Sequence, residues 1–170
     1  MRNVFLIGFM GVGKSTIARM LASELQMELV EMDETIEAEA GMSINEMFAQ
    51  FGETHFRDLE SALVERISKE GGAIVSCGGG AVLRRENVEW MKESGKIIFL
   101  SATPETIYER VHHSTKRPLL NGNMNVEYIT SLMERRKKNY EAAADVVIPT
   151  DDKGKMQIVN EIIDNCFLEE

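Results

Sequence analysis

The stretch GFMGVGKS, residues 8–15, decides the fold class of this chain. It has the spacing G-x-x-x-x-G-K-[ST], follows the apolar run NVFLIG (3–8) and opens a helical pattern, which is the context that a phosphate-binding loop requires. The glycines let the loop curl so that consecutive N–H groups point at phosphate oxygens, and the helix N-terminus adds a partial positive charge. The lysine can bridge the β- and γ-phosphates, and the serine hydroxyl can ligate Mg²⁺. We therefore expect a nucleoside triphosphate to bind on Gly11, Val12, Gly13, Lys14, Ser15 and Thr16.

Four more apolar runs follow the first along the chain. They are LVEM (29–32), AIVSC (73–77), KIIFL (96–100) and DVVI (145–148). Each run is short and nearly continuous, as is typical of strands that are buried on both faces of a parallel sheet. Apolar residues at helical spacing lie between the runs. They are Ile17, Met20, Leu21 and Leu25 in one segment, and Phe56, Leu59, Leu63 and Ile67 in another. This alternation predicts an α/β fold with a five-stranded parallel sheet between two layers of helices.

Composition narrows the classes of function. The 170 residues fit one domain of ordinary size, and the net charge of −9 argues against binding to nucleic acid. The apolar run at the N-terminus is too short for the core of a signal peptide, and no segment approaches the length of a membrane span. The two cysteines have no metal-ligand spacing, so we expect reduced thiols in a cytoplasmic, monomeric protein without a membrane partner.

One segment interrupts the alternation of strands and helices. Residues 112–125, HHSTKRPLLNGNMN, are polar and have no periodicity. A loop of this length within a compact domain is usually functional, so we expect a mobile lid; an ordinary surface loop is the alternative.

A phosphate loop alone does not choose between a GTPase, an ATPase motor and a small-molecule kinase. A GTPase needs an N-K-x-D motif, and the lysine-containing runs near the later strands do not fit it. A motor needs a metal-binding acid at the end of an apolar strand, whereas the third strand here ends in SCGGG (76–80). The size of the chain and the expected lid favour a kinase that acts on a small acceptor.

Five further stretches resemble the motifs of the shikimate kinase family. They are MDETIE (32–37), GETHFRDLE (52–60), CGGGAV (77–82), RPLL (117–120) and RRKKNY (135–140). Together they cover most of the chain in the order and spacing of that family. The resemblance implies a P-loop kinase fold of the nucleoside-monophosphate-kinase type, and transfer of phosphate from ATP to the 3-hydroxyl of shikimate. Alternatives are another small-molecule kinase of this fold, of the gluconate or nucleoside-monophosphate type, and an inactive nucleotide-binding regulator.

The resemblance also implies roles on the acceptor side, in a region of about residues 32–61 and beyond. Asp33 matches the aspartate that holds the acceptor hydroxyl and can take its proton, although an aspartate after a strand can instead cap a helix. Arg57 and Arg136 match the pair that grips the substrate carboxylate, for which the rigid guanidinium fork is well suited. The glycines of the third-strand turn would let the acceptor ring approach the backbone, unless that turn needs them only for positive φ. They are Gly78, Gly79 and Gly80.

On the nucleotide side, the resemblance implies that Arg117 reaches over the triphosphate from the lid. Arg110 and Lys153 would lie near the adenine. Glu31 stands where the family commonly has an aspartate that contacts Mg²⁺ through water, so Ser15 and Glu31 form the implied metal site. Lys138 stands where the family often has a proline, and a lysine lets the helix continue.

Overall fold

A computed structural model describes residues 2–112 and 125–167. The five expected strands form one parallel sheet in the order β2-β3-β1-β4-β5. Their bounds are Asn3–Ile7 (β1), Glu28–Glu31 (β2), Ala73–Ser76 (β3), Gly95–Ser101 (β4) and Val146–Pro149 (β5). The predicted α/β fold with a five-stranded parallel sheet is therefore confirmed, and each expected strand lies within two residues of its observed bounds.

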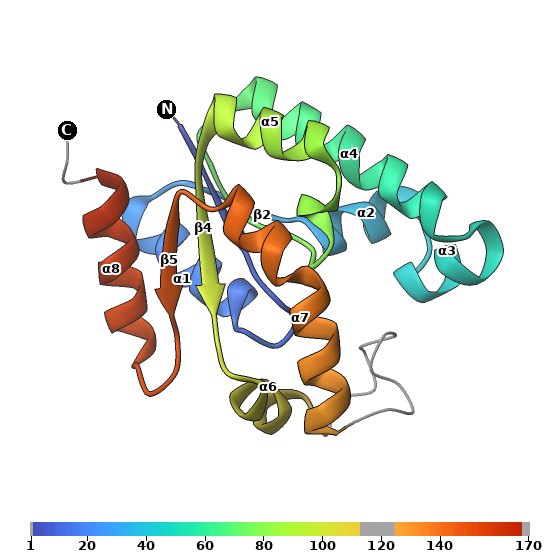
Figure 1. Ribbon diagram of the computed structural model, residues 1–170. Coiled ribbons are helices and arrows are strands. Elements are labelled where there is room, and N and C mark those ends of the chain that lie inside the picture. The colour runs from blue at the N-terminus through green and yellow to red at the C-terminus, as the bar shows by residue number, and fades with distance from the viewer. Residues whose placement is uncertain (1, 113–124, 168–170) are drawn as a thin grey trace.

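Helices cover both faces of the sheet (Figure 1). Helices α1 (Lys14–Leu25) and α8 (Lys155–Phe167) pack together on one face. Helices α4 (Glu53–Glu70), α5 (Arg85–Ser94) and α7 (Val126–Ala143) lie on the other face. The remaining helices are α2 (Met32–Ala40), α3 (Ile44–Phe51), the short 3₁₀ helix η1 (Ala81–Leu83) and α6 (Pro104–Val111). This arrangement is the one that right-handed crossovers between parallel strands produce.

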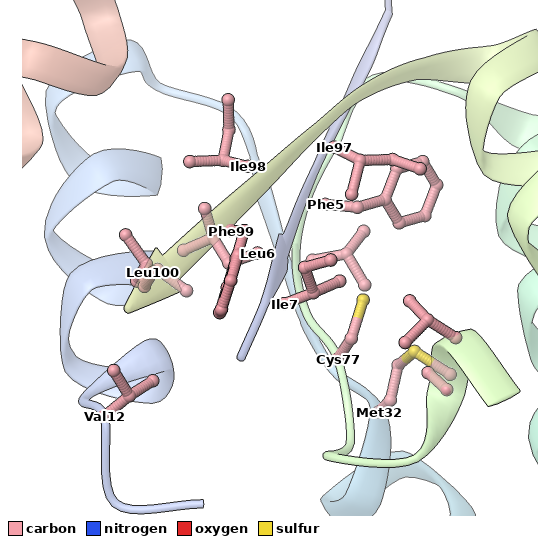
Figure 2. Close-up of a cluster of buried hydrophobic side chains, with 14 of the residues drawn as sticks. Phe5, Leu6, Ile7, Val12, Met32, Cys77, Ile97, Ile98, Phe99 and Leu100 are labelled. Carbon is pink, nitrogen blue, oxygen red and sulfur yellow. The ribbon is translucent and has the colours of Figure 1, made fainter. Parts of the chain in front are cut away.

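The centre of the core is formed by β1 and β4. All five residues of β1 are buried, and Figure 2 shows its side chains from Phe5 to Ile7 among those of residues 97–100. Both strands are buried on two faces because helices cover both sides of the sheet, which explains their continuous apolar sequences. The core fixes the carboxyl ends of these strands, from which the site is built.

Local sequence signals mark where several helices begin. The Ser43 hydroxyl accepts a hydrogen bond from the N–H of Glu46 at 3.1 Å, and the Thr103 hydroxyl accepts one from the N–H of Thr106 at 3.3 Å. Both residues are therefore N-caps of the kind that their sequences predict. Helix α7 runs without a break through Lys138, as expected for a residue that replaces a helix-breaking proline.

Most of the predicted lid, including Arg117, lies outside the described residues. Both cysteines, Cys77 and Cys166, are free thiols. Within the described ranges every helix is either too short or too polar to span a lipid bilayer.

Candidate active site

A pocket of about 300 Å³ opens at the carboxyl ends of β1, β2 and β3. These three strands are neighbours in the sheet, so the loops that follow them meet at one edge. This is the position where open α/β sheets bind ligands. The pocket brings together the phosphate loop, Asp33 and the glycines after β3, although these segments are far apart in sequence. Its polar lining includes Lys14, Ser15, Glu31, Asp33 and Arg110.

The phosphate loop has the curled backbone that its glycines predict. Gly11 and Gly13 have φ angles of 82° and 102°, and Gly13 caps the N-terminus of α1. The Lys14 ammonium donates hydrogen bonds to the carbonyl oxygens of Gly8, at 2.6 Å, and Phe9, at 3.2 Å. The lysine side chain is thus buried against the loop, and its two hydrogen bonds stabilise the curled backbone.

Asp33 lies in the first turn of α2 and is exposed. The N-cap of this helix is Glu31, whose side chain forms no capping hydrogen bond, and Asp33 lies inside the helix. The alternative interpretation of Asp33 as a helix cap is therefore wrong. A negative charge is nevertheless favourable in the first turn because of the helix dipole. Asp33 Oδ1 lies 2.8 Å from the position that a Cβ on Gly78 would occupy, so the carboxylate sits directly against the glycine turn.

The three consecutive glycines are explained by their neighbours rather than by their backbone angles. None of Gly78, Gly79 and Gly80 has a positive φ, so the alternative of a turn that merely requires that conformation is wrong. A Cβ would instead meet Asp33 at Gly78, would lie 3.1 Å from Arg136 Nη1 at Gly79, and would collide with the Arg57 guanidinium at Gly80. Each glycine thus leaves room for one of the three side chains expected to hold the acceptor.

Glu60 is a residue of this site that the sequence analysis missed. Its side chain is 1% exposed, and its Oε1 accepts a hydrogen bond of 2.9 Å from Arg57 Nη1. Its Oε2 is buried with no hydrogen-bond partner among the described residues, and it lies 3.1 Å from the Cβ position of Gly78. Burial raises the pKa of Glu60, and the charge of Asp33 raises it further, while Arg57 and Arg136 lower it. The available signal in the sequence was that Glu60 follows Arg57 by three residues, a spacing that makes the two side chains neighbours on a helix.

We expect Glu60→Gln to change how the free energy of unfolding depends on pH. Because the pKa of Glu60 is raised above 4.5, the folded chain holds this proton more tightly than the unfolded chain. The contribution of Glu60 to the free energy of unfolding of the wild type therefore falls as the pH rises from 4.5 through the raised pKa. Glutamine cannot ionise, so the variant gains stability relative to wild type over that interval. Urea unfolding of both proteins between about pH 4 and 8 measures the difference.

The matched control for this experiment is Glu70→Gln, which changes an exposed carboxylate on the same helix. It should follow the wild-type curve. A Glu60→Gln curve that runs parallel to wild type at every pH would contradict the assignment of this titration to Glu60.

Helix α7 contributes a second arginine to the glycine turn. Arg136 is half-buried beside Gly79, whereas the neighbouring Arg135 is exposed. One helical turn later, the hydroxyl of Tyr140 donates a hydrogen bond of 2.6 Å to the carbonyl oxygen of Gly79. The structure therefore brings Arg136, and not Arg135, to the same glycine turn as Arg57 and Asp33.

The remaining predicted nucleotide contacts lie at different places. Arg110 Nη1 donates a hydrogen bond of 2.8 Å to the carbonyl oxygen of Val12, so its guanidinium is held against the phosphate loop. Lys153 forms an ion pair with Glu161 at 2.9 Å and does not line the pocket described above. The contacts predicted for both residues with adenine remain predictions.

The oxygen atoms needed by Mg²⁺ are present beside the phosphate loop. Ser15 Oγ lies 3.4 Å from Ser76 Oγ, and both residues line the pocket together with Glu31. Glu31 Oε1 is buried without a hydrogen bond from a described residue, and Arg19 Nε is 3.5 Å from it. Hard hydroxyl and carboxylate oxygens suit a magnesium ion that retains several waters. No cluster of three or more His, Cys, Asp or Glu side chains suited to a metal occurs in the described part of the chain. The fit is therefore to a metal held largely by phosphate and water.

Comparisons with known proteins agree with this geometry. A model of the shikimate kinase family matches residues 10–167. A shikimate kinase of Persephonella marina is 45% identical over 163 residues, which cover 96% of this chain and 98% of that protein. A shikimate kinase of Thermodesulfovibrio yellowstonii is 39% identical, with 96% and 94% of the two chains covered.

Solved structures give the same result. Shikimate kinase from Acinetobacter baumannii in complex with shikimate matches with a TM-score of 0.91 and 28% identity, covering 97% of this chain and 92% of that chain. Shikimate kinase from Aquifex aeolicus matches with a TM-score of 0.81 and 33% identity, covering 95% and 94%. A gluconokinase from Sinorhizobium meliloti has a TM-score of 0.55 and 18% identity, covering 94% and 88%, a likeness that concerns the fold alone.

Proposed function

Because this chain belongs to the shikimate kinase family and catalyses the ATP-dependent phosphorylation of shikimate, we propose that Asp33, Arg57 and Arg136 hold the acceptor over the glycine turn. The observation that carries this proposal is that Gly78, Gly79 and Gly80 each abut one of these side chains. The two guanidinium groups grip the shikimate carboxylate. Asp33, at the other end of the turn, then binds the 3-hydroxyl of shikimate.

Chemically, the proposed roles follow from what phosphoryl transfer requires. The transferred group needs little covalent assistance, so positioning of the two reactants and neutralisation of charge dominate the rate. Arg57 and Arg136 orient the ring through its carboxylate, and Asp33 orients the attacking oxygen and accepts its proton. Glu60 holds Arg57 through the 2.9 Å hydrogen bond and so keeps one guanidinium in its gripping position.

On the donor side, ATP occupies the phosphate loop. The N–H groups of residues 11–16 and the Lys14 ammonium bind its phosphates, and Arg117 adds positive charge from the lid. Ser15 holds Mg²⁺ directly and Glu31 holds it through water. The ion, when bound, neutralises the developing charge on the phosphates. A lid that closes over the reactants excludes water, which would otherwise compete with the hydroxyl for the phosphate.

The proposal extends to the state of the protein in the cell. We infer a monomer in the cytoplasm, from a chain of single-domain size whose two thiols are free. Its partners are the two small-molecule substrates, and the net charge of −9 disfavours nucleic acid.

An acceptor panel tests the assigned function. Purified protein with ATP and Mg²⁺ is expected to release ADP when shikimate is added, and to remain at background with gluconate or a nucleoside monophosphate. The product should carry phosphate on the 3-hydroxyl by ³¹P and ¹H NMR. Release of ADP with another acceptor but not with shikimate would overturn the function.

The glycine turn gives a prediction specific to the acceptor. In Gly80→Ala, the new methyl group displaces the Arg57 guanidinium, which is the flexible end of its side chain. We expect the KM for shikimate to rise about tenfold to 100-fold, the scale of one lost charge-assisted hydrogen bond. The KM for ATP should change less than about twofold.

Gly79→Ala is the graded companion to this variant. Its methyl group would lie 3.1 Å from Arg136 Nη1, a closeness that a small shift relieves, so we expect a smaller rise in the same constant. Equal changes in the KM values of both substrates would mean that the glycines serve only the fold of the turn.

A further inference from the structure

Tyr140 connects the two parts of the acceptor site that come from different segments. It lies on α7 one helical turn after Arg136, and its hydroxyl donates to the carbonyl oxygen of Gly79 at 2.6 Å. We propose that Tyr140 is a positioning residue that fixes the Gly79–Gly80 peptide and Arg136 relative to each other, and thereby sets the affinity for shikimate. This inference rests on the proposed roles of Arg136 and the glycine turn.

The tyrosine is held from several sides. Its side chain is 2% exposed, and its ring packs against Phe99 of β4 with centroids 5.1 Å apart. Burial raises the pKa of the phenol, while the charge of Arg136 and its hydrogen bond to the phenol lower it. The hydroxyl donates to the backbone of the turn, and Arg136 lies beside it: the hydroxyl oxygen is 3.7 Å and Arg136 Nη1 is 3.1 Å from the position that a Cβ on Gly79 would occupy.

The hydrogen bond from Tyr140 to Gly79 determines the direction in which the N–H of Gly80 can donate. A peptide group is planar and trans, so fixing the carbonyl of Gly79 also fixes the N–H of Gly80, which points in the opposite direction. Neither Gly79 nor Gly80 has a side chain that could hold this peptide plane by packing, and glycine backbones have wide conformational freedom. Between the described residues, the N–H groups of both glycines form no hydrogen bond. They remain available as donors to an acceptor above the turn.

The hydrogen bond of Tyr140 also links the glycine turn to α7. Residues four apart lie on the same face of a helix, so Arg136 and Tyr140 both face the glycines. Arg57 approaches the turn from a different helix, and it is held there by Glu60 at 2.9 Å. Each arginine thus has a neighbouring residue at the turn: the Glu60 carboxylate is hydrogen-bonded to Arg57, and the Tyr140 phenol lies beside Arg136.

Tyr140→Phe tests the inference because it keeps the ring and removes only the hydroxyl. We expect the dissociation constant for shikimate, measured by calorimetry without ATP, to rise about tenfold. The KM for shikimate should rise in parallel, while kcat and the KM for ATP stay within about twofold. Tyr128→Phe, at a half-buried tyrosine on the same helix, is the matched control and should bind shikimate like wild type.

The outcomes separate this inference from the proposed function. Unchanged shikimate binding by Tyr140→Phe, in a protein where Arg136→Met does lose affinity, overturns the role of Tyr140 alone. Equal losses for shikimate and ATP, together with a lower melting temperature, would also overturn it, because they indicate a general loss of structure. Wild-type protein that does not phosphorylate shikimate would instead overturn the function itself.

Discussion

Replacing Asp33 by asparagine is expected to lower kcat by about 10²-fold to 10⁴-fold, the range typical of a lost general base. Asparagine retains the size of the side chain and one acceptor oxygen, but it cannot take the proton of the attacking hydroxyl. The KM values for shikimate and ATP should change much less than kcat, because Arg57, Arg136 and the phosphate loop remain. Steady-state assays with each substrate varied separately measure both effects.

The variant should fold normally. Asp33 is exposed and is not the N-cap of α2, and the substitution removes a favourable charge from the first turn of that helix. That charge is worth about 0.3–1 kcal/mol. A suitable control is Asp58→Asn, since Asp58 is an exposed carboxylate that pairs with Arg84 at 2.9 Å. If Asp33→Asn lost ATP binding as completely as turnover, the defect would be in folding rather than in proton transfer.

The fold was predictable because its signals are local. Strands that are buried on both faces have continuous apolar sequences. A phosphate loop lies at a fixed place in the chain, between the first strand and the first helix. The residues Ser43 and Thr103 mark helix starts through hydrogen bonds that reach only three residues along the chain. The resemblance of separate motifs to one family then supplied candidate residues for the site.

The parts that escaped prediction depend on contacts between distant segments. Glu60 has the sequence of an ordinary helical glutamate, and its importance appears only when Arg57, Asp33 and Arg136 are seen to face it. The three glycines could not be explained from φ preferences, because their cause is the approach of three side chains from α2, α4 and α7. Lys153 was placed by its position after the last strand, whereas its ion pair with Glu161 depends on how α8 packs.

Arg136→Met is expected to raise the KM for shikimate by about 10²-fold or more. Methionine keeps much of the apolar stem but removes the guanidinium, which leaves the substrate carboxylate with Arg57 as its principal partner. Removing one member of a hydrogen-bonded charge pair costs about 2–5 kcal/mol, and each ~1.4 kcal/mol is a factor of ten in affinity. The KM for ATP should stay close to its wild-type value, because Arg136 faces the glycine turn and not the phosphate loop.

The adjacent Arg135 provides the decisive control for this prediction. Arg135→Met removes the same charge from the same helix, so the two variants have equal net charge and a similar helix propensity. Arg135 is exposed, whereas Arg136 lies beside Gly79. Long-range attraction of the anionic substrate would be reduced about equally in both variants, and it would weaken with added salt. A direct contact predicts a large effect in Arg136→Met alone that persists at high salt; similar losses in both variants would show that shikimate senses only the general charge of α7.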